Sequence, residues 1–154
     1  MIIRRIQSAD LDEWLRMRLA LWSDHNPQEL LSEMHEILAD QEGQPVFVAE
    51  RPAGGLGGFL EASSHVDTYG CETSPVGYIE GWYVDPDLRL QGVGEQLVDA
   101  AEQWAISQGY LEMASDCEIG NQVSFRAHLS LGYEEKERLI HFGKWIGDPP
   151  HGIL

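Results

Sequence analysis

Apolar and polar residues alternate along this chain with two different periods. Apolar residues recur at helical spacing in four stretches, at residues 10–22, 27–38, 92–108 and 121–131. Around them lie short stretches rich in β-branched and aromatic residues, which predict strands at residues 1–6, 45–50, 57–64, 76–84, 110–115 and 133–145. The predicted order is βααβββαβαβ, which indicates a mixed α/β fold with helices flanking one central sheet.

Residues at the ends of the predicted helices support these boundaries. Asp10 and Glu13 have the spacing of a capping box, and Pro27 stands at a first helical position. Gly109 and Gly132 follow two of the apolar stripes, at the place where glycine commonly ends a helix. The sequence contains no linker long enough to divide it, so we expect a single domain over residues 1–154.

The charge of the chain limits what it is expected to bind. It has 26 acidic residues against 10 basic ones, a formal net charge of −16. That sign argues against a nucleic-acid partner, because phosphate backbones attract basic surfaces. An acidic surface attracts cations, although acidity can equally serve solubility alone. Composition therefore admits a cationic substrate without establishing one.

The sequence also predicts a cytoplasmic protein. No apolar run approaches the roughly 20 residues of a membrane span, so we expect no membrane partner. The first ten residues lack the apolar region of a signal peptide. Cys71 and Cys117 are not spaced as metal ligands, and we expect two free thiols in a reducing compartment and no metal.

The most specific local motif is a glycine-containing turn between a predicted strand and a predicted helix, Arg89-Leu-Gln-Gly92-Val-Gly94. A helix N-terminus offers unpaired N–H groups and positive partial charge, which suit a pyrophosphate. A dinucleotide fingerprint would need glycine where Leu97 stands. A P-loop would need lysine where Glu95 stands. The turn therefore fits neither of these nucleotide motifs.

This turn, in its order of elements, resembles the acetyl-CoA signature of the GCN5-related N-acetyltransferase (GNAT) family, Arg/Gln-x-x-Gly-x-Gly/Ala. The resemblance implies acetyl-CoA as co-substrate and a splayed strand pair, 82–84 against 111–115, whose unpaired backbone binds the pantetheine arm. It also implies that Asn121, a typical N-cap residue, binds the cofactor from the next helix. The remaining implied cofactor contacts are Trp82, Tyr83 and Val84 on the strand and Leu90, Gln91, Gly92, Val93, Gly94 and Glu95 in the turn.

The chain departs from the family pattern at a tyrosine thought to protonate the departing thiolate. The matching position, four residues before Gly132-Tyr133, is His128. A histidine can serve as the acid, or it can be a packed core residue. Protonation by solvent is a third possibility, because a thiolate is a good leaving group. The sequence leaves these three open.

Further segments resemble the short aminoglycoside 6′-N-acetyltransferases of Gram-negative bacteria. They include Leu21-Trp22-Ser-Asp-His25, Met113-Ala-Ser-Asp116 and Gly132-Tyr-Glu-Glu135-x-Glu137-Arg, in the family's order. The resemblance implies an aminoglycoside substrate and a homodimer in which the late strand helps to complete the partner's site. The implied substrate contacts are Trp22, His25, Glu80, Asp116 and Glu137, with Asp67 or Tyr69 in the place of a family tyrosine.

Carboxylates suit such a substrate, because they form charge-assisted hydrogen bonds with ammonium groups. We expect direct attack by the 6′-amine on acetyl-CoA in a ternary complex, with Glu80 as the catalytic base and Asp116 as the second candidate. Both carboxylates also have a plainer interpretation as strand-end caps or ion-pair partners. The alternative acceptors are a polyamine, another small amine or a protein N-terminus, and a non-catalytic acyl-CoA-binding module is a further alternative.

Overall fold

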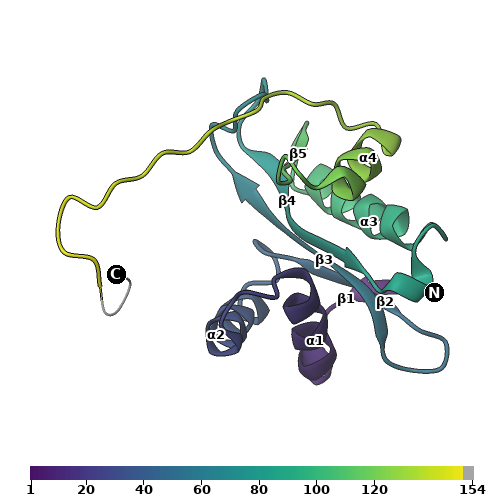
Figure 1. The fold of residues 1–154 in the computed structure, drawn as a ribbon. Helices are drawn as coiled ribbons and strands as arrows, with labels where there is room; N and C mark the ends of the chain where they lie inside the picture. Colours follow the sequence, from purple (N-terminus) through teal and green to yellow (C-terminus); the bar gives the residue numbers. More distant parts are fainter. Residues whose placement is uncertain (151–154) are drawn as a thin grey trace.

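The computed structural model describes residues 1–150, which form a five-stranded sheet with helices on both faces (Figure 1). The strands are β1 (Ile2–Arg5), β2 (Val46–Glu50), β3 (Leu56–His65), β4 (Val76–Val84) and β5 (Met113–Ser115). They lie in the sheet in chain order, with the first four antiparallel and β5 parallel to β4. The helices are α1 (Leu11–Leu21), α2 (Pro27–Leu38), α3 (Val93–Ser107) and α4 (Gln122–Ser130), with 3-10 turns at Ser8–Asp10 and Pro86–Leu88.

Different helices cover the two faces of the sheet. On one face α1 and α2 bury Trp14 and Met34 against Phe59 of β3. On the other face α3 buries Leu97 and Ala101, and α4 lies beside α3 (Figure 1). On each of these helices, apolar residues three or four positions apart form the stripe that faces the sheet.

Most of the predicted boundaries agree with the structure. β4 spans residues 76–84 as predicted, and α2 begins at Pro27. Asn26 caps α2, because its side-chain oxygen accepts a hydrogen bond from the Gln28 N–H at 2.8 Å. The strand expected at 110–115 is shorter, because only Met113–Ser115 pairs with β4.

The expected capping box between Asp10 and Glu13 does not form. Asp10 instead accepts a hydrogen bond from the Gln7 N–H at 2.8 Å and pairs with Arg4 of β1 at 2.7 Å. Glu13 accepts from the Leu56 N–H at 3.1 Å. Asp10 is thus taken by residues that precede it, and Glu13 by a residue distant in the sequence, so the two do not cap the same helix start.

Residues 133–145, predicted as a last strand, form no strand within the described chain. After α4, residues 134–150 (the C-terminal arm) run away from the sheet and helices (Figure 1). A strand needs a hydrogen-bonded neighbour, and none of the sheet strands formed by residues 1–150 pairs with the arm. The observed order is therefore βααβββαβα. The large apolar side chains of the arm are exposed, namely Leu139, Ile140, Phe142, Trp145 and Ile146.

Three chemical features of the described chain bear on its function. Cys71 and Cys117 are both free. Among residues 1–150, no helix has the length and apolar character needed to cross a membrane. The same residues contain no group of three or more His, Cys, Asp or Glu side chains arranged to hold a metal ion.

Candidate active site

β4 contains a bulge at Glu80. On the facing strand β3, Glu61 pairs with Gly81 and the adjacent Ala62 pairs with Ile79, so Glu80 has no partner residue of its own. A bulge bends the strand and re-aims the side chain of the extra residue. The Glu80 side chain is accordingly 40% exposed, although its neighbours Ile79 and Gly81 are buried.

The second neighbour of β4 leaves it at the same point. β5 pairs with Gly77, Tyr78 and Ile79, and the pairing ends at Ile79 with Ser115. Beyond Glu80, β4 continues to pair with β3 on one edge but has no paired strand among residues 1–150 on the other. An unpaired edge leaves backbone N–H and C=O groups available to a ligand. This geometry agrees with the splay expected beside residues 82–84.

The segment Arg89–Glu95 (the cofactor loop) leads from β4 into α3 through residues with unusual backbone angles. Leu90 and Gly92 have φ of 62° and 83°, in the left-handed region that glycine adopts without steric cost. The first hydrogen bond of α3 runs from the Gln96 N–H to the Gly92 carbonyl at 3.1 Å. The N–H groups just before Gln96 therefore have no intrahelical partner, as a pyrophosphate site requires.

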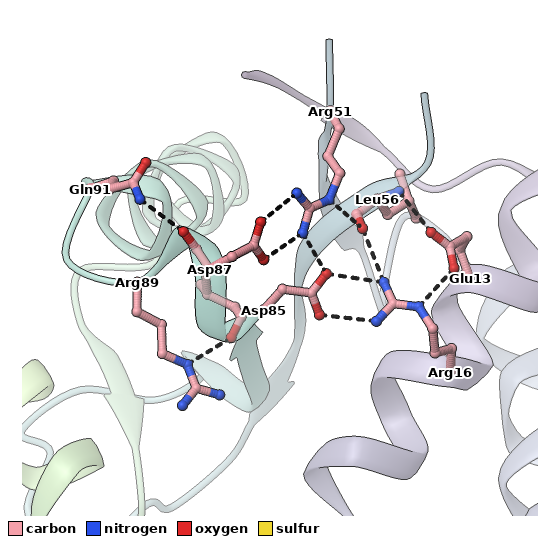
Figure 2. Close-up of polar contacts among 9 residues, drawn as sticks. Glu13, Arg16, Arg51, Leu56, Asp85, Asp87, Arg89 and Gln91 are labelled. Atoms are coloured by element: carbon pink, nitrogen blue, oxygen red, sulfur yellow. Dashed lines mark hydrogen bonds and ion pairs between the residues drawn. The ribbon is translucent and has the colours of Figure 1, made fainter. Parts of the chain in front are cut away.

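A network of ion pairs fastens the start of this loop to the rest of the fold (Figure 2). Asp85, directly after β4, accepts hydrogen bonds from Arg16 of α1 at 3.0 and 3.1 Å and from Arg51 at 2.9 Å. Burial alone would raise the pKa of Asp85, but the two guanidinium groups outweigh it and hold that pKa below its usual range. Arg89 Nε donates to the Val84 carbonyl at 2.9 Å. The loop is thus anchored to α1 and to the end of β4.

Trp82 of β4 connects the cofactor loop to α4. Its ring lies against Gly94, where an added Cβ would come within 3.1 Å of it, and it meets the His128 ring edge-on at 5.3 Å. The Trp82 indole N–H is buried and has no hydrogen-bond partner among residues 1–150. A buried donor of this kind requires an acceptor, and the amide carbonyls of a pantetheine arm provide one. Trp82 therefore fits the expected acetyl-CoA site.

His128 of α4 lies where β4 and β5 separate. Its Nδ1–H donates to the Ser124 carbonyl at 2.7 Å, so its Nε2 accepts from the Ser115 hydroxyl, also at 2.7 Å. Ser115 is the last β5 residue paired with β4. His128 is thus both packed against Trp82 and hydrogen-bonded at the split. Asn121 caps α4 by accepting from the Ser124 N–H at 3.1 Å.

Two adjoining cavities open beside Glu80, on the side of the sheet that α1 and α2 cover. Glu33, Glu61 and Glu80 line both cavities, and Trp22 and His25 form further walls of one of them. The exposed carboxylates of Glu33 and Glu80, with the aromatic wall, suit a ligand that carries ammonium groups on sugar rings.

A buried arginine binds two of the carboxylates that line these cavities. Arg18 of α1 is fully buried and forms two hydrogen bonds to Glu61, both at 2.7 Å, and one to Glu33 at 2.8 Å. Its guanidinium also lies 4.9 Å from the centre of the Trp22 ring. The Trp22 ring in turn covers Gly81, where an added Cβ would sit 2.7 Å from a ring carbon. Trp22 therefore lies beside the bulge that presents Glu80.

The two candidate bases have separate hydrogen-bond donors. Glu80 Oε1 accepts from the Ser63 hydroxyl at 2.6 Å and also from His65 Nε2. Asp116, which follows β5, accepts from the Tyr78 hydroxyl. Glu80 pairs with His65, and neither carboxylate pairs with Arg126 or Arg138, the arginines that the sequence offers as ion-pair partners, in the described chain.

Four of the expected substrate contacts do not line the cavities, and the first is Asp116, directly after β5. Asp67 and Tyr69 lie in the loop between β3 and β4, and Tyr69 is 76% exposed. Glu137 lies in the C-terminal arm and is exposed. None of these four residues lines either cavity. Within one copy of the chain, the expected contacts at the cavities are thus Trp22, His25 and Glu80.

The sequence did not single out Glu33, Glu61, His65 or Tyr78. Glu33 appears in the sequence as one of several acids on α2, and Glu61 as a polar residue within a mostly apolar strand. His65 and Tyr78 stand two residues from Ser63 and Glu80 respectively. Period-two spacing along β3 and β4 is the one signal that points to a shared face.

Comparisons with known proteins agree with this geometry. Residues 9–133 match the model of the Acetyltransferase (GNAT) family. The chain is 40% identical over 145 residues to an aminoglycoside N(6′)-acetyltransferase type 1 from Klebsiella aerogenes, covering 93% of this chain and 95% of the relative.

Two solved structures are similar over nearly their whole length. One is the apo aminoglycoside 6′-N-acetyltransferase AAC(6′)-IG from Acinetobacter haemolyticus, with a TM-score of 0.88, 37% identity, and coverage of 96% of this chain and 100% of that one. The other is AAC(6′)-Iy in complex with the bisubstrate analogue CoA-S-monomethyl-acetylneamine, with a TM-score of 0.87, 36% identity, and coverage of 94% and 97%. The chain therefore belongs to the GNAT acetyltransferase family and, within it, to the group of the aminoglycoside 6′-N-acetyltransferases.

Proposed function

We propose that this protein transfers the acetyl group of acetyl-CoA to the 6′-amine of an aminoglycoside, and so confers resistance to such antibiotics. The observation that carries the proposal is the acidic cavity at the bulge of β4, next to the unpaired strand edge and the cofactor loop. A polycationic acceptor bound in this cavity places an amine next to the expected position of the acetyl-CoA thioester. The relative AAC(6′)-Iy binds a single molecule that joins CoA to an acetylneamine.

The chemistry needs no covalent acyl-enzyme. The 6′-ammonium first loses a proton, and Glu80 is the proposed acceptor because it lines both cavities. The free amine then attacks the thioester carbonyl, so that a C–N bond forms as the C–S bond breaks. A backbone N–H on the unpaired edge of β4 is the proposed donor to the carbonyl oxygen. The new amide nitrogen loses its second proton, and the released CoA thiolate takes up a proton from solvent or from His128 in its doubly protonated form, which lies at the split beside Ser115.

The proposal extends to a homodimer in the cytoplasm, where acetyl-CoA and reduced thiols are available. The C-terminal arm exposes apolar side chains such as Phe142 (92% exposed) and Ile146 (97% exposed), which a monomer leaves in water. A second copy is the proposed partner of the arm. Glu137 lies on this arm, so arm exchange would bring its carboxylate toward the site of the partner.

The test is turnover of acetyl-CoA measured with a thiol-detecting reagent. The acceptors to compare are kanamycin, its counterpart with a 6′-hydroxyl group, and spermidine. Turnover with kanamycin but not with the 6′-hydroxyl compound supports both the substrate class and the position. Turnover with spermidine alone would leave an acetyltransferase with a different acceptor and would contradict the aminoglycoside proposal.

Glu80→Gln tests the proposed base. The variant keeps the size and hydrogen-bonding reach of the side chain but has no carboxylate to accept the proton. We expect kcat with kanamycin to fall by roughly 100-fold or more, the usual range for a lost general base. Acetyl-CoA binding, measured by calorimetry, should remain as in the wild type. Near-normal turnover across the pH range would remove Glu80 from the mechanism.

A further inference from the structure

The two oxygens of Glu80 have different surroundings. Oε1 accepts two hydrogen bonds, from the Ser63 hydroxyl at 2.6 Å and from His65 Nε2. A carboxylate can only accept, so His65 is bound in the tautomer or charge state with a proton on Nε2. Oε2 accepts none from residues 1–150. Glu80, which lines both cavities, therefore has one oxygen engaged by supporting residues and one without a hydrogen bond from residues 1–150.

The other candidate carboxylate is held in a similar way. The Tyr78 hydroxyl donates to Asp116 Oδ2, and no hydrogen bond from residues 1–150 reaches Oδ1. Burial and the nearby Asp116 raise the pKa of Tyr78 above its usual value, so the phenol keeps the proton that it donates.

The two supporting donors are themselves in contact. The rings of His65 and Tyr78 stack with their centres 3.9 Å apart and an angle of 8° between their planes. His65 comes from β3 and Tyr78 from β4, and their side chains lie on the same face of the sheet. A continuous series of contacts thus runs from Glu80 through the two rings to Asp116. This series of contacts lies next to the point where β5 separates from β4.

We propose that His65 and Tyr78 are positioning residues, whose stacked rings hold Glu80 and Asp116 so that one oxygen of each faces the acceptor. This inference rests on the proposed function, because it assigns the two free oxygens to two amino groups of one polycationic acceptor. The stacked pair then fixes the direction and separation of two anionic contacts. An acceptor with amines at a matching separation gains both contacts, whereas a simple monoamine gains one.

A purely structural role explains these contacts less well. The side chains of His65 and Glu80 are 39% and 40% exposed. Exposed ion pairs of this kind contribute little to stability, because holding two side chains in one geometry costs entropy and water screens their charges. The same contacts matter for turnover, because small displacements of a group that meets the reacting amine are costly in rate.

The chain offers a matched pair of variants for the test. His65→Phe and Tyr78→Phe each remove one hydrogen-bond donor and keep an aromatic ring for the stack. Steady-state turnover with kanamycin and acetyl-CoA should show a fall in kcat/KM for kanamycin of about tenfold for each variant, a magnitude typical of coupled neighbouring side chains. The KM for acetyl-CoA should not change. His65→Gln, which restores an N–H donor, should recover part of the loss.

Double-mutant cycles separate positioning from a general loss of fold. His65→Phe should have little further effect when Glu80 is already Gln, and Tyr78→Phe little further effect when Asp116 is already Asn. His65→Phe in the Asp116→Asn background is the control, and its loss should remain. Kanamycin affinity measured by calorimetry provides a second readout where turnover is too slow.

The outcomes distinguish this inference from the proposed function. An equal loss from His65→Phe with and without Glu80 would overturn the positioning role while leaving the proposed function standing. Wild-type activity in both His65→Phe and Tyr78→Phe would also overturn the positioning role and leave the proposed function standing. Absence of kanamycin turnover in the wild-type enzyme would overturn the proposed function and this inference together.

Discussion

Asp85→Asn removes the charge that anchors the cofactor loop, while it keeps the size of the side chain. The Asp85 side chain is 8% exposed and receives three hydrogen bonds of 2.9 to 3.1 Å from Arg16 and Arg51. Removing one partner of a buried ion pair costs about 3–5 kcal/mol, because the remaining charge is left unpaired. Here each arginine keeps another acceptor, Glu13 for Arg16 and Asp87 for Arg51. Arg16 and Arg51 are also 43% and 28% exposed, so we expect a loss below that range, about 1–2 kcal/mol.

Thermal unfolding at one fixed protein concentration measures this loss. In a domain of this size, 1 kcal/mol corresponds to about 2–4 °C, so Tm should fall by about 2–8 °C. Asp87→Asn is the matched control, because it removes a carboxylate of the same network (Figure 2) that is 64% exposed and screened by water. Its Tm should stay close to that of the wild type. If the two variants melt at the same temperature, burial does not set the strength of this anchor.

Three further predictions follow from the same geometry. Because the folded state lowers the pKa of Asp85, its contribution is present above the unfolded pKa of about 3.9 and is lost as pH falls through the folded value. The Tm difference between wild type and Asp85→Asn should therefore be constant from pH 7 to about 5 and should close below about pH 4. Gly92→Ala places a Cβ at a φ of 83° and should cost about 1–2 kcal/mol and weaken CoA binding in calorimetry. Gly120→Ala is the control, because that position is equally uncrowded but has no positive φ, and it should change neither the stability nor CoA binding. Deleting residues 134–154 should give a monomer in light scattering that binds CoA and has lost most kanamycin turnover, whereas an unchanged dimer would contradict arm exchange.

The parts of the fold that were predictable are those that burial dictates locally. α2 and α3 bury one face each, so their apolar residues recur at helical spacing in the sequence. β4 was predicted at its observed limits because six of its nine residues are β-branched or aromatic. The short length of β5 was not predictable. It depends on the divergence of β5 from β4, which coincides with the Glu80 bulge against β3 and is a tertiary event.

The candidate site also has features that were predictable from the sequence and features that were not. The glycine turn was predictable, because positive φ at Gly92 and the start of a helix are local properties. Glu33 and Glu61 were not, because they meet only through the buried Arg18, which comes from a different helix. Nor was the side of the sheet faced by the residues of β4 that follow Glu80. Strict alternation along β4 assigns each residue a side, and the bulge shifts that assignment by one residue.

The C-terminal arm shows what a hydrophobic pattern can and cannot specify. The pattern at 133–145 is that of a strand, and the structure shows no strand there among the described residues. Alternation of apolar and polar residues states that one face needs burial, but it does not state which surface provides that burial. Within one chain the arm has no strand beside it, and its apolar residues remain exposed. If a second copy covers the arm, the strand prediction and the isolated-chain structure are both correct, each for a different assembly state. Light scattering of the full-length chain and of the version without residues 134–154 decides between this interpretation and a plain error in the strand prediction.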